Sequence, residues 1–250
     1  SGFSKKYNSN MKEKTVSEAL AHRRSVRVFD PEKPIETKKV KYCLEQASLA
    51  PNSSNLQLWE FYHITGLEMK KLVAINCYDQ PAAKTAQELV IPVVRLDLWQ
   101  SRIKSNIEFI QSNVKNTEDE KKIKGALTYY QKIIPQLYKG SWYILGLLHK
   151  IKVIFDGIRK VTYREVTSAD LRVVGHKSTA LAAQTFMVSM AAHGYDTCPM
   201  EGFDSKRLKK LLNLPSGAQI SMVIGCGIRK PEGLYGKRFR IPFNEVYRRL

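Results

Sequence analysis

The sequence has 250 residues, of which 43% are hydrophobic and 26% charged, with 14 glycines and 10 prolines. This composition provides for one sizeable core and excludes a disordered, collagen-like or low-complexity chain. The 41 Lys and Arg residues against 23 Asp and Glu residues give a formal net charge of +18. Because net charge bears on partners rather than on fold, nucleic acid, an acidic membrane surface and a phosphorylated small molecule stay open as partners.

The start of the chain is polar and has no apolar segment typical of a secretion signal. We predict a disordered or vector-derived lead over residues 1–14, followed by a single domain over residues 15–250. The four cysteines are far apart and form no Cys-x-x-Cys pair, which disfavours a zinc site. In a chain of this length we predict buried, reduced thiols and a cytoplasmic location.

Two helices are predicted first. A short helix begins at Thr15 and ends before Arg23, and a second helix, capped by Thr37, continues until Pro51 stops it. The residues of the first helix predicted to face inward are Val16, Ala19 and Leu20.

Strands and helices then alternate. The aromatic and β-branched run Trp59–Thr65 predicts a strand, and Leu67–Ile75 a helix. Leu89–Arg95 predicts a buried strand, in which Pro92 indicates either a sheet edge or a bulge.

The region Leu96–Arg172 has a mixed helical pattern and is predicted to be a long insertion. Its most apolar stretch, Trp142–Phe155, is too short for a membrane span, which takes about 20 residues. Two alternatives stay open for this stretch: a helix or hairpin packed on the core, which we favour, and a helix on a membrane surface.

The last third of the chain begins with the clearest helix, Ser178–His193, which is small and apolar nearly all round and is closed by Gly194. Gln219–Ile228 predicts a central strand, and Phe243–Leu250 a final strand. A Rossmann domain is disfavoured, because strands and helices do not alternate strictly and no Gly-x-Gly-x-x-Gly follows the first strand.

Four polar clusters interrupt this framework. The run His22–Arg27 offers guanidinium groups that suit a phosphate monoester or the polar edge of a flavin, although alone it favours a solvated basic turn. Pro51–Gln57 is equally well a plain loop, and Cys198–Asp204 a tight turn. If the segment that contains Arg238 and Arg240 is extended, both side chains project from the same side and can bind one anion together.

Together the clusters carry a family resemblance. The opening reads Arg-Arg-Ser-Val-Arg-x-Phe, the loop Pro-x-Ser-Ser-Asn-x-Gln-x-Trp, and the Ala-rich helix leads to Gly-Tyr-Asp-Thr-Cys-Pro-Met-Glu-Gly-Phe. The chain closes with Arg-x-Arg-x-Pro. In order and spacing these motifs resemble the FMN-dependent nitroreductase family from about Val16 to the end, leaving Leu96–Arg172 uncovered.

The resemblance implies an α+β fold with a mostly antiparallel sheet flanked by helices, in a domain-swapped homodimer that holds two FMN molecules at its interface. It also implies that NADH or NADPH donates hydride to FMN, and that a nitroaromatic, a quinone or a related electron acceptor then takes the same place in a ping-pong cycle. No side chain would be needed as nucleophile or base.

The resemblance also implies which residues of this sequence contact FMN, namely those at positions that match the family's motifs. The first FMN segment is Arg23, Arg24, Ser25 and Arg27. The phosphate would be met by Arg23, Arg238 and Arg240, and the N1/O2 edge of the ring by Arg27. The other subunit would contribute Pro51, Asn52, Ser53, Ser54, Asn55 and Gln57. Backbone groups lining the ring near N5 would come from Pro199, Met200, Glu201 and Gly202.

The sequence departs from the family before the second strand, where relatives commonly carry an Asn and a Lys that contact the ring. Gln80 could replace the Asn, whereas Ala82 occupies the position of the Lys. The reduced flavin would then depend more on Arg27, unless Lys84 takes part.

Two other functions stay open: a module that stores or transfers FMN without fast turnover, and a basic polyanion-binding protein. Because the basic residues are scattered and no nucleic-acid-binding motif is present, we predict no dedicated nucleic-acid partner. We also predict no membrane partner.

Overall fold

The computed structural model describes residues 13–140 and 143–250. Its centre is a five-stranded sheet with the order β1-β2-β5-β3, in which β4 also pairs with β2. All these pairs are antiparallel, which confirms the predicted fold class. The strands are β1 (Trp59–Ile64), β2 (Glu88–Arg95), β3 (Asp196–Met200), β4 (Ala218–Ile220) and β5 (Val223–Gly227).

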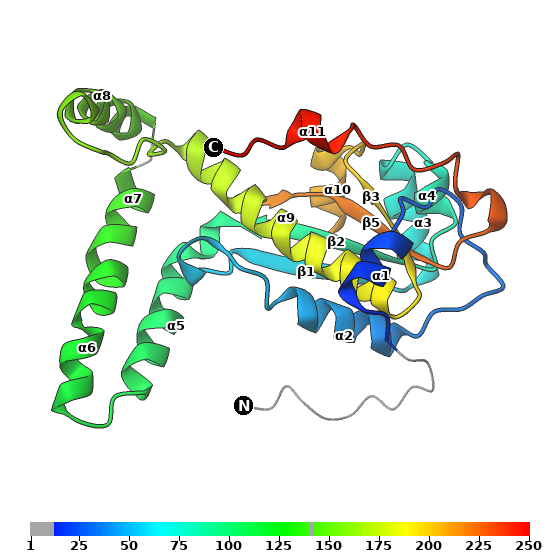
Figure 1. The fold of residues 1–250 in the computed structure, drawn as a ribbon, viewed down its shortest axis with the longest axis horizontal. Helices are drawn as coiled ribbons and strands as arrows, with labels where there is room; N and C mark the ends of the chain where they lie inside the picture. The colour runs from blue at the N-terminus through cyan, green and yellow to red at the C-terminus, as the bar shows by residue number, and fades with distance from the viewer. Residues whose placement is uncertain (1–12, 141–142) are drawn as a thin grey trace.

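Helices cover both faces of the sheet (Figure 1). In β2, Val90 packs with one helical layer, whereas its neighbours Leu89 and Ile91 pack with the other, as the alternation of side chains along a strand requires. One layer is α2 (Thr37–Ala47) and α9 (Ser168–Ala192); the other is α3 (Leu67–Asn76), α4 (Pro81–Lys84) and α10 (Ser205–Leu211).

The long helix α9 confirms the predicted buried helix, but it begins ten residues before Ser178. Thr167 and Asp170 form a capping box that starts the helix, and the spacing of these two residues is a helix-start signal in the sequence. Gly194 has φ +80° and ends the helix as predicted. At Gly175 a Cβ atom would lie 2.8 Å from Val94 Cγ1, so the absence of a side chain lets α9 approach β2 closely.

Pro92 lies at a bulge, one of its two predicted settings. Val90 pairs with Ile224 and Val93 with Ile220. Between these pairs, β2 has two residues (91–92), whereas the chain that forms β4 and β5 has three (221–223), which is one residue more. The predicted strand Gln219–Ile228 is therefore divided into β4 and β5. The Pro92 carbonyl accepts a hydrogen bond from Ser221 N at 2.9 Å.

Two details near the N-terminus were predicted wrongly. In α1 (Val16–His22) Ala19 is buried, but Val16 and Leu20 are exposed, because the helix packs on α9 along a narrow stripe. Thr37 does not cap α2, because the helix has Glu36 at the capping position and the Thr37 hydroxyl donates to buried Glu88 instead.

The predicted final strand Phe243–Leu250 was also wrong, since the segment contains the short helix α11 (Phe243–Val246). The apolar residues 243, 246, 247 and 250 recur at helical rather than alternating spacing. The Phe243 and Tyr247 rings stack with centroids 5.0 Å apart. Conversely, β3 formed where the sequence analysis considered only a turn.

The predicted insertion forms a helical arm that extends away from the sheet (Figure 1). Its base packs against Leu56, Leu58 and Leu171 through Ile103 and Tyr130. The arm comprises the 3-10 turn η2 (Leu96–Leu98), α5 (Trp99–Ser112), α6 (Thr117–Thr128), the π-helical turn η3 (Tyr129–Ile133), α7 (Ile134–Gly140) and α8 (Tyr143–Arg159).

The apolar stretch that ends at Phe155 does not pack on the core, contrary to the favoured prediction. Trp142 lies outside the described residues, and the remainder belongs to α8, which lies away from the sheet at the upper left of Figure 1. Ile154 and Phe155 are exposed there, because the arm and not the sheet supports this helix. Within the described ranges, no helix is long and apolar enough to cross a membrane.

Two further sequence predictions concern the start of the chain and the cysteines. Residues 1–12 of the predicted lead lie outside the described residues, but Lys14 N donates to Ala192 O at 3.0 Å and so belongs to the fold. All four cysteines are buried thiols, as predicted, and burial raises the pKa of each.

Candidate functional site

A cavity of about 200 Å³ opens where the first basic segment meets the C-terminal segment. Arg24 Nη2 donates to Gly236 O at 2.7 Å across 212 positions of sequence, which ties the two segments together. The cavity is lined by Arg23, Arg24, Ser25, Lys237, Arg238, Phe239 and Arg240. The structure thus brings together the two arginine segments that the resemblance directs to one phosphate.

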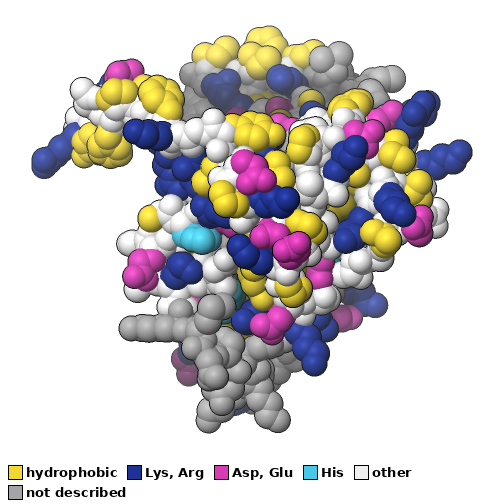
Figure 2. Space-filling view, turned by 90° about the vertical axis from the view of Figure 1, so that its right-hand side faces the viewer, with side chains coloured by type: hydrophobic (Ala, Val, Ile, Leu, Met, Phe, Trp, Pro, Cys, Tyr) yellow, Lys and Arg dark blue, Asp and Glu magenta, His cyan; other side chains and the backbone are white. Residues whose placement is uncertain are grey.

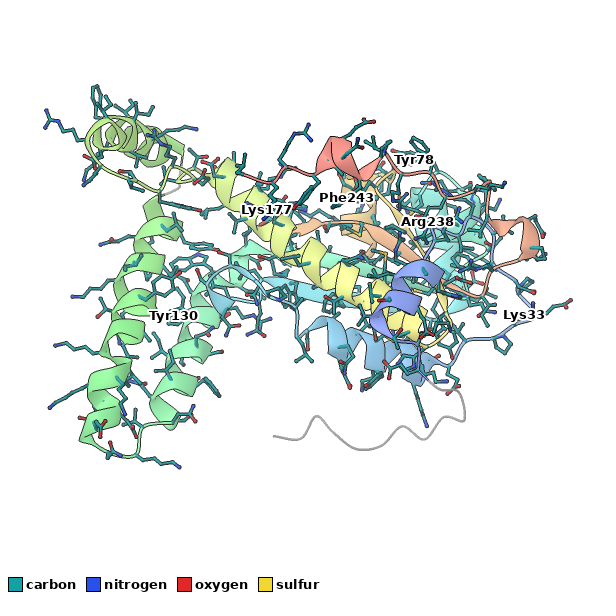
Figure 3. The ribbon with its side chains drawn as sticks, in the orientation of Figure 1. Lys33, Tyr78, Tyr130, Lys177, Arg238 and Phe243 are labelled. Carbon is teal, nitrogen blue, oxygen red and sulfur yellow. The ribbon has the colours of Figure 1, made fainter. Side chains whose placement is uncertain are left out.

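Arg238 fixes this arrangement from the C-terminal side. Its guanidinium donates to the carbonyl oxygens of Leu20, Ala21 and Arg23 at 3.2, 2.9 and 2.6 Å. These carbonyls lie at the end of α1, where a cation is electrostatically favourable. Arg238 therefore lies against α1 (Figure 3) and holds the tail on the cavity.

The cavity has a strongly positive field. Burial lowers the pKa of Arg23, and repulsion from Arg238, Arg240 and Arg24 lowers it further. The described residues that line the cavity include no carboxylate. An anion with several oxygens, such as a phosphate monoester, would accept hydrogen bonds from these guanidinium groups and remove the repulsion between them.

The buried carboxylate of Asp196 holds the end of α1 in place through Arg229. Asp196, in β3, accepts hydrogen bonds from the Arg229 guanidinium and from Arg229 N, the latter at 2.8 Å. Arg229 Nη2 donates to His22 O at 2.9 Å, and His22 Nε2 lies 3.3 Å from Asp196 Oδ1. Burial lowers the pKa of His22 despite the neighbouring carboxylate. This network sets where the chain enters the basic segment at Arg23.

The basic segment then runs beside β3. Val26 N donates to Thr197 O at 3.2 Å, and Arg27 N to Gly233 O at 2.8 Å. Burial raises the pKa of the Cys198 thiol, and the charges of Arg27 and Arg23 oppose that rise. Two cations thus lie near the strand that leads to the segment Pro199–Gly202.

Gln80 connects the predicted ring-contacting segments. Its Nε2 donates to Gly202 O at 2.7 Å, and the turn before it is formed by Tyr78 and Asp79 with φ of 55° and 52°. Ala82, at the position of the family's Lys, is fully buried under the sheet. Lys84 lines a separate cavity between α3 and α4, so in this structure it does not take the place of the absent Lys.

The loop Pro51–Gln57 lies elsewhere, at the base of the arm. Ser54 Oγ and Tyr129 OH are 2.7 Å apart, and Tyr130 OH donates to Ser54 O at 2.9 Å. Asn52 Oδ1 accepts from Gln57 N at 2.8 Å. The backbone is left-handed at Ser54, Asn55 and Gln57, an arrangement that these side chain contacts stabilise.

This loop and the basic cavity do not meet within one chain. Tyr130, which holds the loop, and Arg238, which holds the tail, are at well-separated positions along the molecule (Figure 3). None of the loop's residues lines the cavity of the same chain, and its assignment to the other subunit's site stays a prediction.

Sequence reasoning missed four residues of this framework: Tyr129, Tyr130, Asp196 and Arg229. The two tyrosines lie in a π-helical turn, which a hydrophobic pattern does not reveal. Asp196 lies inside the motif Gly-Tyr-Asp-Thr-Cys-Pro-Met-Glu-Gly-Phe, just before the apolar residues Cys198–Met200 of the strand, and this position was an available signal for a buried charge that needs a partner.

Comparison with known proteins identifies the family. The Nitroreductase family model matches residues 20–228. The chain belongs to the nitroreductase family. It is 24% identical to the protein DrgA of Synechocystis over 221 residues, 88% of this chain and 87% of that protein. It is also 24% identical to a candidate NAD(P)H nitroreductase of Staphylococcus epidermidis, over 91% of this chain and 94% of that protein.

Solved structures show the same nitroreductase fold. The candidate nitroreductase YdfN of Bacillus subtilis has a TM-score of 0.70 at 21% identity, over 94% of this chain and 98% of the other. A candidate nitroreductase of Exiguobacterium sibiricum, solved in complex with FMN, has a TM-score of 0.65 at 19% identity, over 97% and 100% of the two chains.

Proposed function

We propose that this nitroreductase family member is an FMN-dependent oxidoreductase that uses NADH or NADPH to reduce nitroaromatics, quinones or related acceptors. The observation that carries the proposal is the carboxylate-free cavity between Arg23–Ser25 and Lys237–Arg240. The FMN complex of the Exiguobacterium sibiricum relative and the NAD(P)H nitroreductase name of the staphylococcal relative support it.

The residues of this cavity fit a phosphate monoester. Burial and then repulsion from the neighbouring guanidinium groups lower the pKa of Arg23, so a bound dianion would stabilise the cavity. A single basic cavity of this kind matches FMN better than FAD, which carries a second phosphate. The ring would extend along β3 toward Pro199–Gly202, with Arg27 at its N1/O2 edge and Gln80 at the side of Gly202.

FMN, when bound, supplies the chemistry: it takes hydride from NAD(P)H and passes electrons to an acceptor that enters after the nicotinamide leaves. The side chains of this protein bind and orient. The guanidinium groups of Arg23 and Arg240 hold the phosphate, and Arg27 provides a fixed positive charge at the ring. The loop Pro51–Gln57 of a second copy would close the site, which makes the homodimer the functional unit.

The test begins with the purified protein reconstituted with FMN and with FAD in parallel. We expect a yellow protein whose acid-released cofactor runs with the FMN standard on chromatography. Under anaerobic conditions, NADH or NADPH should bleach the visible absorption, and a quinone or nitroaromatic should restore it. Binding of FAD alone, or of no flavin, would overturn the proposal.

Two other outcomes define the alternatives. Bound FMN without fast bleaching would favour a module that stores or transfers FMN. Polyanion binding as the main activity would favour the nucleic-acid alternative, but Lys and Arg side chains are interspersed with Asp and Glu on the face shown in Figure 2 and form no continuous stripe. Polyanion binding that weakens as the salt concentration rises and shows no sequence preference would indicate non-specific attraction to a basic protein.

A further inference from the structure

The outer face of α8 carries an apolar stripe that has no partner among the described residues. Ile151, Ile154, Phe155 and Ile158 are 45%, 50%, 66% and 76% exposed. Their spacing of three and four residues places them on one side of the helix. The opposite side carries Val153, which is 6% exposed and faces the rest of the arm. The stripe therefore lies on the side of α8 opposite the arm, and the helix itself lies away from the sheet (Figure 1).

Basic residues border this stripe on both edges. At 3.6 residues per turn, Lys150 falls on one edge, and Lys152 and Arg159 fall on the other. All three side chains are exposed. The single acidic residue of this stretch, Asp156, falls toward the inner side, where it lies 3.8 Å from Lys160 Nζ and lines a cavity of the arm.

Although the sequence alone led us to predict no membrane partner, we propose that α8 docks on an anionic lipid bilayer, with the stripe buried at the interface and the basic residues against lipid headgroups. An apolar face of this width with lysines and arginines at its edges is typical of helices that lie in the membrane surface. The long side chains of Lys150, Lys152 and Arg159 can extend to the headgroups while the stripe is buried. The formal net charge of +18 adds attraction to anionic lipid.

A second copy of this chain fits the same face less well. A two-fold contact through α8 would bring the two basic edges toward each other. Each chain carries +18, and the one carboxylate of this stretch, that of Asp156, lies 3.8 Å from Lys160 Nζ and is therefore already paired. An anionic bilayer offers an apolar interior to the stripe and negatively charged headgroups to the basic residues.

The test uses the full chain and two kinds of vesicle: phosphatidylcholine alone, and equal parts phosphatidylcholine and phosphatidylglycerol. We expect cosedimentation with the anionic vesicles. Phe155→Glu should lower the partition coefficient ~10-fold or more, because it removes an apolar contact and adds a negative charge. Lys152→Glu should lower it ~10-fold, because it reverses one charge at the surface.

Matched controls separate docking by α8 from general attraction to a basic protein. Phe109, in α5, is 70% exposed on the same arm, and Lys121 is exposed in α6. Phe109→Glu and Lys121→Glu should leave binding within about 2-fold of wild type, since a distant charge is screened. The variant Phe155→Trp should show a blue-shifted emission on anionic vesicles and quenching by brominated lipid.

Several results would overturn the proposal. These are no binding to anionic vesicles, equal losses in Phe155→Glu and Phe109→Glu, or no emission change in Phe155→Trp. A change of oligomeric state in Phe155→Glu, seen by light scattering without vesicle binding, would assign the stripe to a second copy instead. None of these measurements depends on flavin chemistry, so they test α8 independently of the proposed function.

Discussion

Arg240 lies two positions after Arg238, but the two guanidinium groups have different partners. Arg238 binds three carbonyls at the end of α1, whereas Arg240 donates to the adjacent Phe239 O and otherwise faces the cavity. Arg240→Ala should therefore weaken FMN binding about 10-fold to about 150-fold without unfolding the protein. A fluorescence titration of FMN measures this change.

Arg248→Ala is the matched control, because Arg248 is an exposed arginine of the same tail that bonds Asn244 O and lies outside the cavity. It should bind FMN like the wild type. An unchanged dissociation constant in Arg240→Ala would show that the tail does not clamp the phosphate.

Arg27 should act on the energetics of FMN reduction more than on its affinity. A reduced flavin carries negative charge near N1/O2 at neutral pH, and a fixed cation in a partly desolvated site stabilises it. Because Ala82 is buried and Lys84 lines another cavity, neither of these two positions provides a lysine that would share this task with Arg27. Arg27→Ala should lower the reduction potential of bound FMN and slow its reduction by NAD(P)H.

Spectroelectrochemical titration of the FMN-saturated variant against wild type measures this effect. If Arg27 served mainly the phosphate, the variant would instead lose FMN affinity strongly and keep a nearly unchanged potential at saturation.

Two half-buried histidines make stability depend on pH. Burial lowers the pKa of His22 and His193 from the ordinary 6.5. The folded state thus favours the neutral rings, and this contribution is fully present above the unfolded pKa and is lost as the pH falls through the folded values. Tm should fall between about pH 7.5 and about pH 5.5. His193→Gln should make that dependence weaker, whereas an equal slope would exclude His193 as a source.

At the scale of elements, the arm and the loop Pro51–Gln57 form one unit. The π-helical turn η3 places Tyr129 against the Ser54 hydroxyl and Tyr130 against the Ser54 carbonyl. A left-handed residue such as Ser54 needs these external contacts to stay ordered. The arm therefore acts as a positioning element for a loop that, in the proposed dimer, reaches the other subunit's flavin.

Tyr130→Phe should loosen this loop while the ring stays packed at the base of the arm. We expect lower FMN affinity, by roughly 5-fold for one lost hydrogen bond, together with faster amide exchange over residues 52–57. Tyr163→Phe, at an exposed tyrosine beside the arm, is the control and should change neither measurement. Unchanged amide exchange in Tyr130→Phe would contradict the coupling.

At the scale of the molecule, apolar side chains remain exposed on α1, α9 and the tail. Val16, Leu20 and Leu181 belong to the first two, and Phe239 and Phe243 to the tail. Exposed apolar residues spread over adjacent elements are typical of a protein interface. The proposed homodimer would cover them and would bring a partner's loop to each basic cavity.

Light scattering should therefore give about twice the monomer mass of 28.6 kDa. A second measurement mixes subunits that carry Arg240→Ala with subunits that carry Tyr130→Phe. In a mixed dimer one site has both substitutions and the other has neither, so mixing should restore part of the tight FMN binding. Monomer mass with full flavin occupancy would refute the shared site.

Local patterns in the sequence determined the strands β1 and β2, the buried helix ending at Gly194 and the four motifs, whose resemblance to the nitroreductase family implied the fold class. Each is readable locally, because apolar periodicity and a terminal glycine act within a few residues. The tertiary structure decided what depends on distant neighbours. Asp196 is buried and accepts hydrogen bonds from Arg229, which is distant in sequence. One face of α8 is exposed because the arm holds this helix away from the sheet. Contacts such as Arg24 with Gly236, 212 positions apart, depend on the path of the whole chain, which no local window contains.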